Sequence, residues 1–119
     1  MFRKKWQNFV AAIAATVYMW REELSFRIQV AIGIIAFALA YTLHISTTEW
    51  LFVILMVGAV FSVEALNTAI EEICDVFTSE HHPRVGIIKD LGALASAWTG
   101  LAALVIGSII FLPKILALV

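Results

Sequence analysis

The segment that decides the fold runs from residue 50 to residue 75 and reads WLFVILMVGAVFSVEALNTAIEEICD. Its first 14 residues, Trp50 to Val63, carry no charge. The apolar pattern continues beyond Glu64, which predicts one long helix whose far end protrudes from a membrane. A carboxylate at hydrocarbon depth costs about 2.5 to 3.5 kcal/mol, so Glu64 is a candidate functional residue.

Two further apolar runs flank this segment. Ile28 to Ile45 is an uncharged stretch of 18 residues, and Leu91 to Pro113 is a longer one of 23. Each is long enough to approach or exceed the roughly 20 residues that a helix needs to cross the hydrocarbon. The chain is 62% hydrophobic and 14% charged, with a mean hydropathy of +0.96, values that exclude an ordinary soluble domain.

We therefore predict an all-α integral membrane protein that forms one domain over residues 1–119. The expected transmembrane helices cover about residues 27–45, 50–75 and 90–113. The only cysteine, Cys74, excludes an intramolecular disulfide and a cysteine-based metal site, and we interpret it as a small packing residue.

The N-terminal segment has apolar residues at helical spacing behind a basic start. These residues are Trp6, Phe9 or Val10, Ile13, Val17 and Trp20. The pattern predicts an amphipathic surface helix at about residues 2–21, lying in the membrane interface. A cleaved signal peptide is the alternative, although Trp6-Gln7-Asn8 interrupts the expected apolar region.

Positive charges indicate the orientation. Seven of the eight Lys and Arg residues precede the first span or lie between the second and third, and only Lys114 lies beyond the third. The positive-inside rule therefore places the N-terminus in the cytoplasm and the C-terminus outside. The net charge of −1 offers no basic surface for nucleic acid.

A polar stripe crosses the inner end of the central helix. At 100° per residue, Glu64, Asn67, Glu71 and Asp75 fall at about 0°, 300°, 340° and 20°, on one face. At 1.5 Å per residue, Glu64 lies about 21 Å and Glu71 about 31 Å from Trp50, in a hydrocarbon layer about 30 Å thick. This depth profile suits a reaction between a lipid head group and a water-soluble reagent. Interhelical hydrogen bonding is the structural alternative.

Further charged groups lie near the same membrane face. Glu23 and Glu71, at two helix ends, are candidate ligands for Mg²⁺, which favours carboxylate and phosphate oxygens. Lys89 is a candidate for balancing phosphate charge, whereas Asp90 is alternatively a cap of the third transmembrane helix. Because neither a Walker A loop nor the protein-kinase motifs occur, phosphoryl transfer would need another architecture.

The motif Glu64-x-Leu-Asn67-Thr68-Ala-Ile-Glu71, with the Asp75, Glu80-x-His82 and Lys89-Asp90 that follow, resembles the prokaryotic diacylglycerol kinase and undecaprenol kinase family. The resemblance covers nearly the whole chain. It implies three transmembrane helices with an N-terminal surface helix, a homotrimer with shared active sites, and Mg²⁺-dependent transfer of the ATP γ-phosphoryl group to a lipid hydroxyl. It also implies a bacterial plasma-membrane location. Neighbouring chains would wall off Glu64, which three thin helices are not expected to hide from lipid.

The resemblance also implies roles for individual residues. Glu64 matches the catalytic base, Asn67 a motif residue near the reacting groups, and Glu23 and Glu71 the metal-binding carboxylates. The candidate nucleotide contacts are Lys4, Glu23, Glu71, Glu80, His81, His82, Lys89 and Asp90. Lys4 stands where the family often has an arginine, and Ile13 or Ala15 stands where it has a glycine.

The expected lipid substrate is undecaprenol, because the loop His81-His82-Pro83 and the ending at residues 109–114 are more similar to the undecaprenol kinase branch. Diacylglycerol is the alternative substrate. A small proton-coupled transporter that uses Glu64 is an alternative of another class, but it leaves Glu23, Glu71 and Lys89 without a task. A non-catalytic assembly protein explains even less of the polar stripe.

Overall fold

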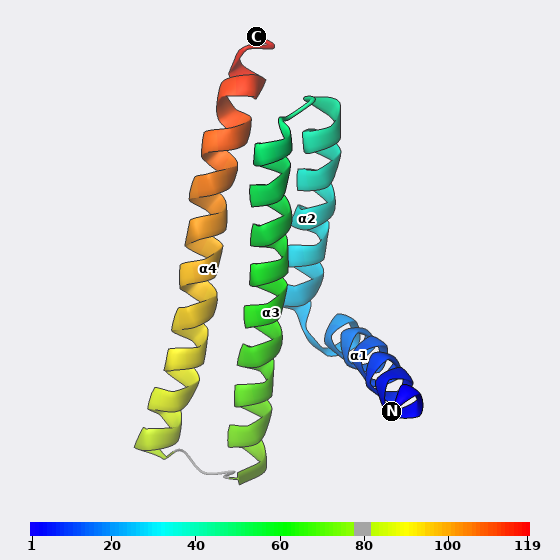
Figure 1. The fold of residues 1–119 in the computed structure, drawn as a ribbon. Coiled ribbons are helices and arrows are strands. Elements are labelled where there is room, and N and C mark those ends of the chain that lie inside the picture. The colour runs from blue at the N-terminus through cyan, green and yellow to red at the C-terminus, as the bar shows by residue number, and fades with distance from the viewer. Residues whose placement is uncertain (78–81) are drawn as a thin grey trace.

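The computed structural model describes residues 1–77 and 82–119, and this part of the chain is helical, with no strand. The four helices are α1 (Phe2–Glu22), α2 (Leu24–Thr42), α3 (Thr47–Phe77) and α4 (Pro83–Leu116). Helices α2, α3 and α4 run side by side, and α1 leaves the foot of α2 at a steep angle (Figure 1). The predicted all-α architecture is confirmed.

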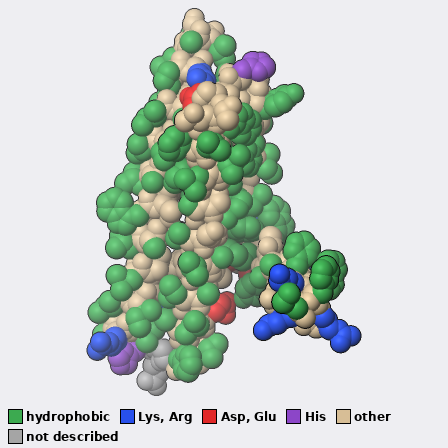
Figure 2. All heavy atoms as spheres, viewed as in Figure 1, with side chains coloured by type: hydrophobic (Ala, Val, Ile, Leu, Met, Phe, Trp, Pro, Cys, Tyr) green, Lys and Arg blue, Asp and Glu red, His purple; other side chains and the backbone are tan. Residues whose placement is uncertain are grey.

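Three of these helices are long and apolar enough to cross a membrane. They are α2 with 19 residues, α3 with 31 and α4 with 34. On the face drawn in Figure 2, charged and histidine side chains gather on α1 and at the two ends of the bundle, and hydrophobic side chains cover its middle. The prediction of three membrane-spanning helices is confirmed, and the long α3 extends through Glu64 to Phe77 as one continuous element.

The helices differ from the predicted spans mainly at their ends. Helix α4 begins at Pro83 instead of near residue 90. The limits of a helix are set by its backbone hydrogen bonds and not by the position of charged residues. Proline suits this first position, since its missing N–H would have no partner there. His82 Nδ1 accepts a hydrogen bond from the Arg84 N–H at 3.1 Å. The interpretation of Asp90 as a helix cap was therefore wrong, since Asp90 lies inside α4.

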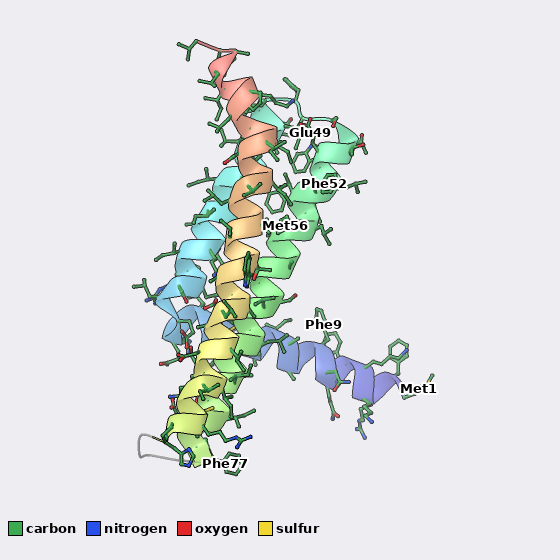
Figure 3. All side chains as sticks on the ribbon, turned by 90° about the vertical axis from the view of Figure 1, so that its left-hand side faces the viewer. Met1, Phe9, Glu49, Phe52, Met56 and Phe77 are labelled. Atoms are coloured by element: carbon green, nitrogen blue, oxygen red, sulfur yellow. The ribbon has the colours of Figure 1, made fainter. Side chains whose placement is uncertain are left out.

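The turn between α2 and α3 is closed by a capping box. The backbone N–H of Glu49 donates to Ser46 Oγ at 3.1 Å, and the Ser46 N–H donates to Glu49 Oε1 at 3.0 Å. Together these bonds satisfy two backbone donors at the start of α3. Glu49 also pairs with Lys114 of α4 at 3.3 Å, which ties the ends of both helices together. Figure 3 shows Glu49 at the end of the bundle opposite Phe77.

The junction between α1 and α2 is a single extended residue, Glu23. Its backbone angles, φ −115° and ψ 106°, interrupt the helix and let α1 turn away from the bundle. Arg27 Nη1 donates to the carbonyl of Trp20 at 3.2 Å and to that of Arg21 at 3.5 Å, which satisfies acceptors at the end of α1. This junction places Glu23 at the start of α2.

Candidate functional site

Glu64 of α3 is buried, with 5% of its surface exposed, and its carboxylate accepts three hydrogen bonds. Ser25 Oγ donates to Oε1 at 2.6 Å. Gln29 Nε2 and Ser96 Oγ donate to Oε2 at 3.3 and 3.0 Å. Because two neighbouring helices of the same chain already enclose Glu64, the expectation that three helices cannot hide it from lipid was wrong.

An apolar cavity of about 500 Å³ lies between α2, α3 and α4. Gln29, which bonds Glu64, is part of its wall. The remaining lining is almost entirely aliphatic, aromatic or glycine, and it reaches Phe111 near the other end of α4. A buried carboxylate therefore adjoins a space suited to a hydrocarbon chain.

Asn67, the next residue of the polar stripe after Glu64, faces α4. Asn67 Nδ2 donates to Glu71 Oε1 at 3.4 Å, and Asn67 Oδ1 is buried without a hydrogen-bond partner among the described residues. A Cβ atom on Gly92 would lie 2.5 Å from that Oδ1 and 3.5 Å from Ile70 Cδ1. Because Gly92 has no side chain, the Asn67 side chain can occupy this space.

Glu23 stands close enough to other acids to be affected by their charge. Partial burial raises the pKa of its carboxyl group, and the charge of Glu71, followed by those of Glu64, Glu72 and Glu22, raises it further. A divalent cation between Glu23 and Glu71 would relieve this repulsion. Within residues 1–77 and 82–119, no cluster of three or more His, Cys, Asp or Glu side chains has metal-binding geometry. A pair of carboxylates fits Mg²⁺ when phosphate and water oxygens complete its shell.

Two contacts tie the lower part of α3 to its neighbours. Lys89 Nζ of α4 lies 2.6 Å from Asp75 Oδ1; the Asp75 side chain is largely exposed and that of Lys89 is partly buried. The Tyr18 hydroxyl of α1 donates to Glu72 Oε1 at 2.7 Å, and this bond raises the pKa of the Tyr18 phenol. Lys89 is thus held by a carboxylate of the polar stripe, at the end of the bundle where α3 ends and α4 begins.

Of the other predicted site residues, some lie at the same end of the bundle as Glu71 and one lies away from the bundle. His82 caps α4 and Asp90 is exposed on it, both at the same end of the bundle as Glu71. Lys4 lies in the first turn of α1, whose N-terminal end points away from the bundle (Figure 1). A single chain therefore does not bring Lys4 to Glu64. Glu80 and His81 lie outside the described residues.

The sequence interpretation missed the three donors to Glu64. Ser25 and Gln29 are four residues apart and therefore share a face of α2, while Ser96 interrupts the apolar pattern of α4. Polar residues inside membrane-grade runs are the signal that marks them, because such groups need a partner in hydrocarbon. Which partner they meet depends on how the helices pack.

Comparison with known proteins identifies similar chains. The family profile described as prokaryotic diacylglycerol kinase matches residues 10–111. Undecaprenol kinase of Bacillus subtilis (strain 168) is 36% identical over 95 residues, which cover 80% of this chain and 77% of that protein. Diacylglycerol kinase of Escherichia coli (strain K12) is 32% identical, with 74% and 78% covered. Diacylglycerol kinase of Synechocystis is 30% identical over 112 residues, which cover 93% of this chain but 64% of that protein.

Proposed function

Because the chain belongs to the prokaryotic diacylglycerol kinase family and is a lipid kinase, we propose that it transfers the γ-phosphoryl group of ATP to the hydroxyl of undecaprenol. One observation carries the assignment of the site: a buried carboxylate, Glu64, lies beside an apolar cavity. A lipid alcohol can place its chain in the cavity and its hydroxyl against the carboxylate. Glu64 then accepts the hydroxyl proton as the oxygen attacks phosphorus.

The phosphate end of the substrate is assigned to the inner end of the bundle. Glu23 and Glu71 would hold Mg²⁺, with Asn67 beside them. Bound magnesium would neutralise charge on the transferred phosphoryl group. The proposed nucleotide contacts, in addition to these carboxylates, are Lys4, Glu80, His81, His82, Lys89 and Asp90.

The choice of undecaprenol is supported by one observation: the relative that is 36% identical is an undecaprenol kinase. The almost entirely apolar cavity wall suits a polyisoprenoid chain and an acyl chain equally. Diacylglycerol remains the second candidate, since two of the relatives are diacylglycerol kinases. Membership of a kinase family sets the transporter alternative aside.

The two substrates are separated by one assay. Purified protein is incubated in mixed micelles with labelled ATP, Mg²⁺ and either undecaprenol or diacylglycerol. We expect labelled undecaprenyl phosphate to form with the higher kcat/KM. A preference for diacylglycerol would overturn the substrate assignment, and no labelled lipid with either alcohol would overturn the kinase mechanism proposed here.

We further propose a homotrimer in the bacterial plasma membrane, with the N-terminus inside and the C-terminus outside. The distribution of Lys and Arg supports the orientation. Shielding of Glu64 does not require a trimer, but Lys4 lies away from the site of its own chain. A nucleotide contact from Lys4 would thus reach the active site of a neighbouring chain.

Replacing Gly92 by alanine tests the placement of Asn67. The new methyl group would meet Asn67 Oδ1 at 2.5 Å, so the Asn67 side chain must shift, which disturbs its bond to Glu71. We expect kcat to fall roughly 10-fold with little loss of stability, since a movable side chain absorbs the clash. Gly58→Ala is the matched control, because nothing lies within 4 Å of the added atom. Equal activity of both variants in the micelle assay would contradict this placement.

The raised pKa of Glu23 predicts a pH-dependent requirement for Mg²⁺. Protons compete with the metal for the carboxylate as pH falls towards this raised pKa, so the Mg²⁺ concentration for half-maximal rate should increase as the pH is lowered. The Glu23→Gln variant should need more Mg²⁺ at every pH and lose this dependence. The same acid-induced increase in Glu23→Gln would assign the effect to the nucleotide instead.

A further inference from the structure

The Glu64 carboxylate has about four lone-pair positions, two on each oxygen. The described residues fill three of them: Gln29 and Ser96 occupy Oε2, and Ser25 occupies one position of Oε1. We propose that Ser25, Gln29 and Ser96 are positioning residues that fix the Glu64 carboxylate in place and leave the last position, on Oε1, for the substrate hydroxyl. This inference rests on the proposed kinase function.

The donors come from both helices that pack against Glu64. Ser25 and Gln29 lie one turn apart on α2, and Ser96 projects from α4. The two oxygens are therefore held from different sides, and the carboxylate cannot rotate without breaking at least one bond. A base fixed in this way presents the same oxygen to every incoming hydroxyl.

The chemical nature of the donors matters as much as their number. A carboxylate accepts a proton only while it is ionised, and ionisation in an apolar setting needs hydrogen-bond donors. Hydroxyl and amide donors stabilise the negative charge without cancelling it. Among the side chains that the structure describes, no Lys, Arg or His pairs with Glu64, so no cationic side chain competes with the substrate hydroxyl for it.

The Gln29 side chain is oriented towards Glu64. Its amide nitrogen points to Oε2, although this leaves its own Oε1 buried without a hydrogen-bond partner in the described part of the chain. Gln29 also lines the apolar cavity, so it connects the carboxylate with the space assigned to the lipid chain. Its bond, at 3.3 Å, is the longest of the three.

Alanine and threonine substitutions test the positioning role. In Ser25→Ala and Ser96→Ala we expect kcat to fall roughly 10-fold or more, with the KM for lipid and for ATP within about 2-fold. Threonine at either position keeps the hydroxyl, so Ser25→Thr and Ser96→Thr should retain most of kcat. Ser62→Ala, an exposed serine two residues from Glu64, should match the unmodified protein.

A second measurement separates positioning from general damage. In a Glu64→Gln background, adding Ser25→Ala should cause no further fall in rate, because the base through which the serine acts is gone. Unchanged kcat in both serine variants, a loss confined to KM, or an equal loss in Ser62→Ala would overturn the positioning role.

The outcomes also distinguish this inference from the function on which it rests. If Glu64→Gln is inactive while both alanine variants are fully active, only the positioning role fails. If Glu64→Gln is fully active, or the unmodified protein phosphorylates no lipid, the proposed catalytic base fails and the positioning role fails with it.

Discussion

The Glu64→Gln variant should lose lipid phosphorylation by about 100- to 10,000-fold, the range expected when a general base is removed. Glutamine has nearly the same shape, and its carbonyl oxygen can still accept the Ser25 hydroxyl, so the bundle should remain folded. It has no carboxylate to take the substrate proton. The loss should therefore appear in kcat, measured with labelled ATP and undecaprenol in mixed micelles, while the KM for ATP stays within about 3-fold.

Glu49→Gln is the matched control, since it makes the same change at the other end of the same helix. It removes the ion pair with Lys114 but keeps a side-chain oxygen that can accept from the Ser46 N–H, so the loss of stability should be small. Its activity should stay within about 2-fold of the unmodified protein at 25 °C. A Glu64→Gln variant that phosphorylates undecaprenol at the normal rate would rule out Glu64 as the base.

The spans and the polar stripe could be predicted because both depend on local regularities. Hydropathy over about 20 residues predicts a membrane helix, and the helical period places Glu64, Asn67, Glu71 and Asp75 on one face. In the structure, Glu64, Asn67 and Asp75 all meet α4, through Ser96, Gly92 and Lys89.

The partners of Glu64 could not be predicted, since they depend on how helices pack. Ser96 lies 32 residues from Glu64 in the sequence, and only the relative rotation of α3 and α4 brings the two side chains together. The sequence also gave no reason to expect Glu23 in an extended conformation, because neither glycine nor proline stands at the junction.

The ends of the helices could be predicted only in part from the sequence. The segment Ser46-Thr47-Thr48-Glu49 has the pattern of a capping box, and the structure contains that capping box. The start of α4 was missed because the prediction followed the uncharged run, whereas His82 and Pro83 begin the helix earlier. Where a membrane helix extends into water, capping chemistry predicts its end better than hydropathy does.

The second large effect is expected at the carboxylate pair proposed to hold magnesium. Glu71→Gln and Glu23→Gln should each lower the rate at about 1 mM Mg²⁺ by roughly 100-fold or more, because the ion neutralises charge on the transferred phosphoryl group. Both variants should also need a higher Mg²⁺ concentration for half-maximal rate. Glu72→Gln is the control, since Glu72 is the neighbour of Glu71 but bonds Tyr18 instead.

A double variant decides whether Glu23 and Glu71 act through one ion. If both carboxylates hold the same Mg²⁺, removing the second should cost little once the first has weakened its binding, and Glu23→Gln/Glu71→Gln should be about as slow as the slower single variant. Independent roles would instead multiply the two losses, to about 10,000-fold. Because the charge of Glu71 raises the pKa of Glu23, the two groups interact before any metal binds, and we expect the losses not to multiply.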